Sequence, residues 1–223
     1  MTPDWTSISA LATAGGTLVL AIATFASVRS ANRAARTAER TLEVGLRPVL
    51  FPSRLQDPPQ KIRWGDDHWA ELRGGRATVQ AVDGVVYLAA SLRNVGAGIA
   101  VLHGWRAGPE TATLATLGTL GTLPQGHPDP EEFRRQGRDL YVPAGDISFW
   151  QAAFRDAGDP DAQAILESIS ERRRLRVDLL YSDHEGGQRA ISRFAVTPPI
   201  HEDGDWLCSV VSHWTLDRPD PRH

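Results

Sequence analysis

The sequence has a single cysteine, Cys208, and a single lysine, Lys61, among its 223 residues. One cysteine excludes an internal disulfide and any metal site built on several thiolates, and it fits a reducing compartment. The formal net charge of −3 argues against nucleic-acid binding by the whole domain. The sequence also lacks zinc-ligand spacings, a nucleophile elbow and a Walker loop, so no catalytic residue, metal ligand or cofactor site is predicted.

What the sequence does contain is one long apolar run. Residues 6–28 carry no charged side chain, and roughly 20 mostly apolar residues cross a bilayer as a helix. Ala21-Ile22-Ala23 also has the small-x-small form of a signal-peptide cleavage site, and a run this rich in Ala, Thr and Ser suits a buried core helix. A signal peptide carries positive charge before its apolar segment, whereas here Asp4 precedes it, so we favour a membrane span.

The flanking charges predict the orientation of this span. Arginine and lysine near a span stay on the cytoplasmic side, and the nearby ones, beginning with Arg29, all follow the apolar run. We therefore expect a single-pass protein of the inner membrane, with a short extracytoplasmic head (residues 1–5) and a cytoplasmic C-terminal domain. Trp5 falls where interfacial aromatic rings are favoured.

A helical pattern continues beyond the span, over residues 29–46, and Gly45 with Pro48 ends it. Its arginines are spaced four, three and four residues apart, which places them on one stripe of a helix. The stripe consists of Arg29, Arg33, Arg36 and Arg40. One interpretation is contact with anionic lipid headgroups. The other is a topology signal with a solvated face, because an upright helix holds only the first arginines near the lipid.

Small residues four apart in the span indicate close helix packing. The pairs are Ala12 with Gly16 and Thr13 with Thr17. Such spacing lets two helix backbones approach each other, which predicts a homodimer through this face. Chance is the alternative explanation, since Ala-rich spans often contain such pairs.

Strand-like patterns replace helical ones over residues 47–216, and Asp83-Gly84 is a favoured two-residue hairpin turn. The expected strands cover residues 49–55, 77–82, 85–93, 99–105, 140–142, 147–154, 175–181, 189–196 and 206–214, with short helices at 129–135 and 161–172. The predicted fold class is mainly β. It comprises an N-terminal transmembrane helix continuing into a juxtamembrane helix, then an antiparallel immunoglobulin-like β-sandwich and a polar tail (residues 217–223).

Two turns carry recognisable patterns. Residues 94–100 read N-x-G-x-G-x-A and residues 181–186 read Y-x-D-x-x-G. In these motifs and in layout, the chain resembles uncharacterised bacterial single-span membrane proteins with an N-terminal helix and a C-terminal cytoplasmic β-sandwich. The resemblance implies the fold but no activity. Gly96 and Gly98 are interpreted as a tight turn rather than a phosphate loop, because a third glycine and a following helix are missing.

Few residues are candidates for chemistry. Asp183, His184 and Glu185 are interpreted as the solvated tip of a hairpin rather than an acid/base site. The acidic run around His201, with Glu202, Asp203 and Asp205, lacks the spacing of a calcium loop. Cys208 and His213 are five residues apart, and odd spacing along a strand predicts opposite faces, which argues against a Cys-His pair.

The tryptophans Trp64 and Trp69 lie in a polar connection, where exposed rings would suit a contact with a protein partner. The leading hypothesis is a membrane-anchored, non-catalytic interaction module that presents its β domain to a protein partner. A small-molecule sensor is the first alternative and requires a pocket of roughly 300 Å³ or more. A hydrolase is the second alternative. It requires His103, His184, His201 or His213 beside two carboxylates.

Overall fold

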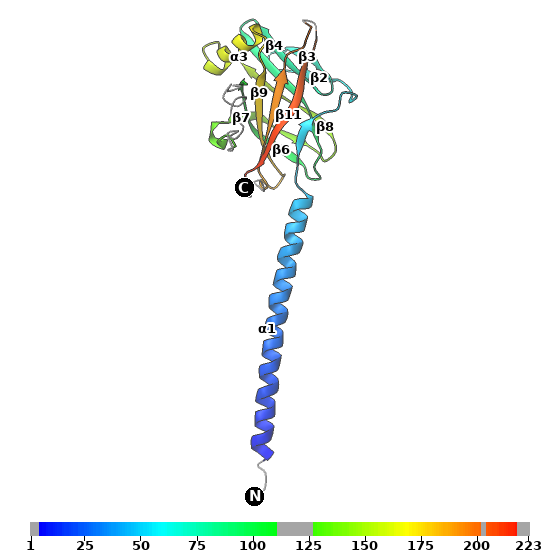
Figure 1. Ribbon diagram of the computed structural model, residues 1–223, viewed down its shortest axis with the longest axis vertical. Helices are drawn as coiled ribbons and strands as arrows, with labels where there is room; N and C mark the ends of the chain where they lie inside the picture. Colours follow the sequence, from blue (N-terminus) through cyan, green and yellow to red (C-terminus); the bar gives the residue numbers. More distant parts are fainter. Residues whose placement is uncertain (1–4, 111–126, 202–203, 218–223) are drawn as a thin grey trace, which may run out of the picture. The chain divides into compact units, whose positions relative to one another are not determined.

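The computed structural model describes residues 5–110, 127–201 and 204–217. It separates the chain into two units, an N-terminal helix and a β-rich domain that begins at Leu46 (Figure 1). The Thr-Leu repeat at residues 113–123 and most of the polar tail lie outside the described residues.

Helix α1 (Trp5–Gly45) is continuous over 41 residues, about 60 Å at 1.5 Å per residue. The predicted span and the predicted juxtamembrane helix are therefore one helix. Its stretch from Thr13 to Glu39 is long and apolar enough to cross a membrane or to be a signal sequence, and none of it is buried in the protein. The Thr13 and Thr17 hydroxyls donate to main-chain oxygens four residues earlier, which satisfies these polar groups within the helix itself.

The described residues of the second unit form two short helical segments and eleven strands. The helical segments are η1 (Pro130–Glu132), capped by Asp129, and α3 (Pro160–Ser170), capped by Asp159. The strands are β1 (Leu50–Pro52), β2 (Gln60–Arg63), β3 (Trp69–Leu72), β4 (Arg76–Val82), β5 (Val85–Asn94), β6 (Ala100–Pro109), β7 (Arg134–Val142), β8 (Ile147–Phe154), β9 (Leu175–Ser182), β10 (Ala190–Thr197) and β11 (Trp206–Thr215).

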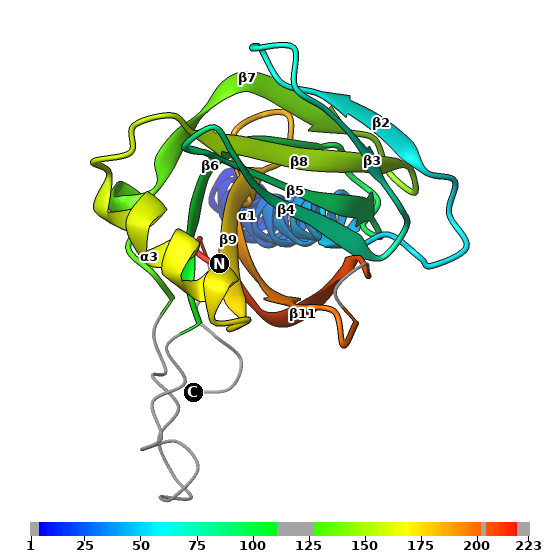
Figure 2. The same cartoon turned by 90° about the horizontal axis from the view of Figure 1, so that it is seen from above.

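Nine of these strands form one antiparallel sheet that curls into a half-barrel (Figure 2). The order along the sheet is β1-β5-β4-β11-β10-β9-β6-β7, and β8 pairs with β5 outside this path. The predictions of a mainly β, antiparallel domain and of the Asp83-Gly84 hairpin are confirmed. The immunoglobulin-like sandwich is wrong, because one curled sheet surrounds the core in place of two stacked sheets.

The interior of the curl is the main hydrophobic core. Trp150, Tyr181 and Phe194 are its largest fully buried side chains, and α3 adds Ala162 and Ile165 to it. A second, smaller cluster joins the β2–β3 hairpin to outward-facing residues of β5 and β8. Both faces of β5 and β8 are thus covered, which explains their nearly continuous apolar sequences.

The amide of Asn94 holds together the place where the chain enters the half-barrel. Asn94 is fully buried. Its Nδ2 donates to the main-chain oxygens of Gly98 and Val142, at 2.6 and 2.9 Å. Its Oδ1 accepts from the main-chain nitrogens of Val49 and Gly96, at 3.1 and 3.0 Å. One side chain therefore joins the segment after α1 to the ends of β5 and β7.

The two glycines of this motif are required by close backbone contacts. A Cβ on Gly98 would lie 1.7 Å from the Leu46 oxygen, and one on Gly96 would lie 2.2 Å from the Arg47 oxygen. The second motif serves the same junction, since the Tyr181 hydroxyl accepts a hydrogen bond from the Leu50 nitrogen at 3.1 Å. Both recognisable motifs thus attach the segment 46–50 to the sheet.

Replacing Gly98 by alanine should destabilise the β domain by about 2–3 kcal/mol, because the added methyl group collides with backbone that cannot move away. Gly65→Ala is the matched control, since a Cβ there meets no atom within 4 Å. Its effect should stay within about 0.5 kcal/mol. Urea unfolding of the full-length chain in neutral detergent, followed by tryptophan fluorescence, measures both. Equal stability of the two variants would contradict the assigned role of Gly98.

Candidate functional site

A groove lies between β7 and β8 on the β domain. These strands follow each other along the chain and are joined by a turn at residues 143–146, yet β7 pairs with β6 and β8 pairs with β5. The space between them has a volume of about 670 Å³. We call it the seam groove; it is lined by Arg63, Trp64, Gly65, Trp105, residues 135–138, residues 151–153 and Arg155.

A large bulge in β7 shapes one wall of the seam groove. Leu102 of β6 stands opposite Leu140, but Gly104 stands opposite Arg135. Four residues of β7, numbers 136–139, therefore face the single residue His103. Bulges of this kind redirect side chains and are frequent at barrel rims and beside functional sites.

The seam groove is rich in arginine. Arg63 pairs with Asp67, and Arg155 pairs with Asp66 at 3.2 Å. Arg135 and Arg138 are exposed on the bulge, and neither side chain makes an ion pair or hydrogen bond with a side chain that the structure describes.

Asp66 is held in its charged form beside the groove. Partial burial by itself raises the pKa of Asp66, but the hydrogen bond from the Tyr87 hydroxyl at 2.8 Å and the charge of Arg155 outweigh it, so the net pKa is lowered. The same surroundings raise the pKa of Tyr87, first through burial and then through Asp66. At neutral pH this corner therefore contains a fixed carboxylate and a neutral phenol.

Arg134 begins β7 and precedes the groove-lining Arg135. Its guanidinium lies 4.8 Å from the ring centre of Phe154 at the end of β8 and 5.8 Å from that of Trp105. It also forms ion pairs of 2.8 Å with Asp159 and Asp161 at the start of α3. These contacts link the start of β7 to the end of β8 and to α3.

The predicted contact residues Trp64 and Trp69 have different surroundings. Trp64 is 3% exposed, and its Nε1 donates to the Ala152 oxygen at 3.0 Å. The expected exposure of Trp64 is therefore wrong: its ring forms a wall of the seam groove. Trp69 is 56% exposed, with the Arg63 guanidinium over its ring at 5.4 Å. Contact of either residue with a partner stays a prediction.

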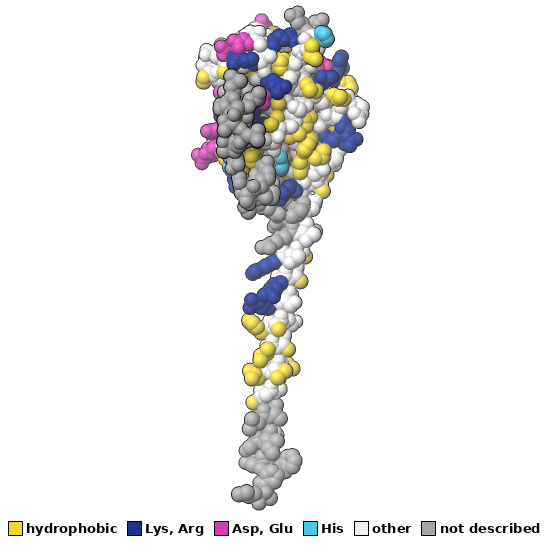
Figure 3. Space-filling model, in the orientation of Figure 1, with side chains coloured by type: hydrophobic (Ala, Val, Ile, Leu, Met, Phe, Trp, Pro, Cys, Tyr) yellow, Lys and Arg dark blue, Asp and Glu magenta, His cyan; other side chains and the backbone are white. Residues whose placement is uncertain are grey.

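The residues predicted on α1 are placed on an exposed helix. In Figure 3 the basic side chains of α1 lie on one side of the helix, next to its hydrophobic stretch. Arg29, Arg33 and Arg36 are exposed, as are Thr13, Gly16 and Thr17. The side chains of Ala12 and Arg40 lie outside the described residues. Lipid contact and self-association therefore stay predictions.

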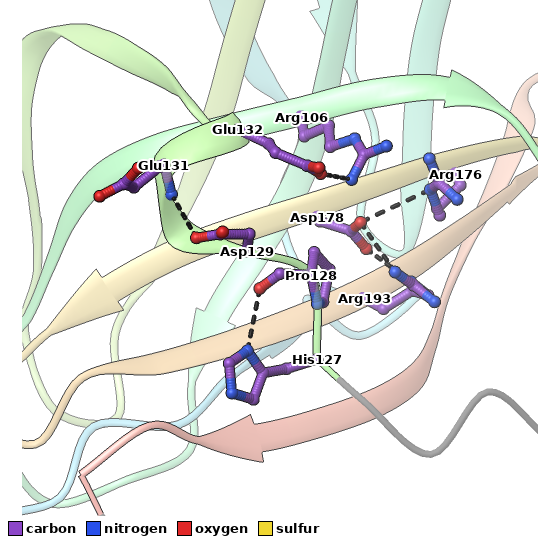
Figure 4. A network of polar contacts seen from close by, with 9 residues as sticks. All are labelled: Arg106, His127, Pro128, Asp129, Glu131, Glu132, Arg176, Asp178 and Arg193. Carbon is purple, nitrogen blue, oxygen red and sulfur yellow. Dashed lines mark hydrogen bonds and ion pairs between the residues drawn. The ribbon is translucent and has the colours of Figure 1, made fainter.

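A second polar network lies on the outer face of β6, β9 and β10 (Figure 4). Asp178 is fully buried and stands opposite both Arg106 and Arg193. Arg193 donates to both of its carboxylate oxygens, at 2.7 and 3.0 Å, and Arg176 approaches to 3.5 Å. Arg106 pairs with Glu132. Both carboxylates are paired with arginines of neighbouring strands, so we interpret the network as a cross-strand clamp rather than a ligand site.

The histidines of the hydrolase hypothesis are scattered. His103 Nε2 lies 2.6 Å from Ser182 Oγ, and His213 Nδ1 lies 3.1 Å from Ser192 Oγ. Both serine side chains are fully buried. His184 is at the exposed β9–β10 tip, and His201 stands beside the undescribed Glu202 and Asp203. Among the described residues, no group of three or more His, Cys, Asp or Glu side chains is placed to hold a metal ion.

Cys208 and His213 lie on the same face of β11, which corrects the expectation from their odd spacing. The register shifts near Val211, and this bulge inverts the alternation of side chains. Cys208 then stands opposite Val196, and His213 stands opposite Ser192. Since these partners are four residues apart, Cys208 and His213 are about 13 Å apart along the strand. They form no catalytic pair.

Sequence reasoning missed the seam groove. Arg135 fell in the short helix predicted over residues 129–135, which is wrong beyond η1 because β7 begins at Arg134. Gln136 and Arg138 fell between that helix and the strand predicted over residues 140–142. Comparisons with known proteins add no family: no family model, no curated protein and no solved structure matches this chain. An apolar N-terminal helix followed by an antiparallel β domain is thus established from the chain itself.

The thiol of Cys208 should be inert in the folded protein. Cys208 is 4% exposed, and burial raises its pKa to about 12, so almost no reactive thiolate is present at pH 8. Iodoacetamide should modify it at least about 100-fold more slowly in the native full-length chain than in guanidinium chloride. Ser209→Cys, on the exposed side of the same strand, is the control and should react rapidly. Fast native modification of Cys208 would contradict its burial.

Proposed function

We propose that this chain is a single-pass membrane protein whose β domain lies on the cytoplasmic side and binds a protein partner without catalysis of its own. The observation that carries the proposal is the seam groove, an arginine-rich opening of about 670 Å³ bounded by two strand edges. The edge of a β-sheet carries unpaired backbone groups that can bind an extended segment of another polypeptide.

The helix supports the membrane part of the proposal. The described side chains of α1 are exposed, as lipid-facing side chains would be. The arginines that follow the apolar stretch favour a cytoplasmic location for the C-terminal side of the helix. The Arg29 stripe would then face the inner leaflet, and the pairs around Gly16 would remain available for a second copy of the helix.

A small-molecule sensor is the second candidate, because the groove volume falls within the range of ligand pockets, about 300–1,000 Å³. The two functions differ in what co-purifies with the protein. A sensor retains a low-molecular-weight compound, whereas an interaction module retains a polypeptide.

The orientation is tested with two fusions at the C-terminus of the full-length chain. We expect a green fluorescent protein fusion to be fluorescent and an alkaline phosphatase fusion to be inactive, because the basic flank holds the C-terminal side in the cytoplasm. Replacing Arg29, Arg33 and Arg36 by alanine while adding three arginines before Trp5 should invert both readouts. An active phosphatase fusion of the unmodified chain would refute the proposed location.

The binding function is tested by purification of the full-length chain from membranes in neutral detergent. We expect one polypeptide to co-purify in stoichiometric amount, and to be lost when the apolar run is kept but the basic flank is inverted, since the domain then faces the wrong compartment. Mass spectrometry of the eluate distinguishes the two candidates. Recovery of a small molecule and no polypeptide would replace the interaction module with the sensor.

A further inference from the structure

Helix α1 carries a groove of its own, at the point where its apolar stretch meets its first arginines. This α1 groove has a volume of about 350 Å³. Its lining positions recur every three or four residues, so they form one face of the helix. The face is apolar towards the N-terminus and cationic towards the C-terminus. The lining residues are Phe25, Val28, Arg29, Asn32, Arg33 and Arg36.

The cations of the α1 groove have no carboxylate among them. The sequence contains no acidic residue between Asp4 and Glu39. Arg29, Arg33 and Arg36 are exposed, and none of them forms an ion pair with a side chain that the structure describes. Like charges across an interface repel, so this face disfavours a second copy of α1 and favours an anion.

The direction of helical side chains brings these arginines towards the bilayer. Side chains of an α-helix lean towards its N-terminus, which in α1 is the side of the apolar stretch. At Arg29, Arg33 and Arg36 the main chain has risen about 1.5, 7.5 and 12 Å beyond the apolar run. The headgroup layer is about 5–7 Å thick on each side, and the long stems extend back towards it. All three guanidinium groups therefore reach the headgroups, although an upright main chain would not.

A phospholipid matches both ends of the α1 groove. Its phosphate meets the arginines, which form forked, charge-assisted hydrogen bonds with phosphate oxygens, and the Asn32 amide adds two donors. Its acyl chains meet Phe25, which is 69% exposed. A soluble anion has no apolar part for this ring, and a soluble polypeptide would have to enter the hydrocarbon to reach it.

We propose that the α1 groove binds an anionic phospholipid of the cytoplasmic leaflet. The lipid phosphate lies among Arg29, Arg33 and Arg36, and an acyl chain packs against Phe25. This assignment rests on the proposed function and names the lipid class that the arginine stripe recognises.

The probe is an equimolar mixture of phosphatidylglycerol and phosphatidylcholine with identical acyl chains, added to the full-length chain in neutral detergent. After repurification, mass spectrometry of the extracted lipid measures their ratio. We expect phosphatidylglycerol to be enriched at least about fivefold. Arg29→Gln, Arg33→Gln and Arg36→Gln together should abolish the enrichment, since the charge-assisted contacts are lost. Persistence of the enrichment in this triple variant overturns the proposal.

The matched control removes the same charge from the β domain. Arg54→Gln, Arg138→Gln and Arg174→Gln together change three exposed side chains far along the sequence from the α1 groove. This variant should alter the lipid ratio less than about twofold. Circular dichroism shows whether each variant keeps its helix.

A lysine variant separates a built site from diffuse attraction. Arg29→Lys, Arg33→Lys and Arg36→Lys keep the positive charge, and with it the orientation signal, but lose the guanidinium fork. The enrichment should fall severalfold, while the C-terminal fusions report an unchanged location. Full enrichment in this variant overturns the groove assignment, because charge alone would then explain it.

The apolar end of the α1 groove is tested with Phe25→Ala. This change should reduce the amount of retained phosphatidylglycerol severalfold, since an acyl contact is lost. Millimolar glycerol phosphate carries the phosphate without acyl chains and should not displace the lipid. Displacement by glycerol phosphate would make the occupant a soluble anion and overturn the lipid assignment.

This proposal and the proposed function fail separately. Fusions that place the C-terminus outside the cytoplasm refute the proposed location, whatever lipid the purified chain retains. Equal retention of the two lipids by the unmodified chain overturns the lipid site and leaves the location and the protein partner unaffected.

Discussion

The half-barrel depends on one buried side-chain amide. Asn94 makes four hydrogen bonds that join the segment after α1, the end of β5, the following loop and the end of β7. The buried main-chain oxygens of Gly98 and Val142 would lose this partner if the amide were lost, and each such loss costs about 1–3 kcal/mol. The glycines at 96 and 98 exist because the joined backbones approach so closely that a Cβ does not fit.

The seam groove is a consequence of this anchor. Asn94 fixes the Val142 end of β7, and its main chain bonds to Asp146 and Gly145 in the turn before β8. From this common point β7 follows β6 and β8 follows β5, so the two strands diverge. Arg134 then ties their far ends to α3. The hairpin that contains β7 and β8 is thereby held by side-chain contacts near its turn and near its far end, and the bulge with its arginines lies between them.

Local features of the fold were predictable and non-local ones were not. The Asp83-Gly84 hairpin and the β9–β10 hairpin are determined by neighbouring residues, and both are confirmed. The order of strands depends on pairings between distant segments, so the curled sheet was missed. Trp64 looked exposed because its neighbours are polar, but its indole N–H finds the Ala152 oxygen 88 residues away. The bulges at 136–139 and near Val211 have no clear sequence signal, and the seam groove depends on the first of them.

The directions of the strands around the half-barrel have a further consequence. Every neighbouring pair in the large sheet is antiparallel, and β7 and β8, the two strands that bound the opening, run in opposite directions. A single strand added between β7 and β8 would therefore run parallel to one of them and antiparallel to the other. The closed barrel would then contain an odd number of strands, and an odd number cannot all pair antiparallel, so one pair would be parallel. Parallel pairing is slightly less stable per residue than antiparallel pairing, so an added strand would be bound more weakly on its parallel side.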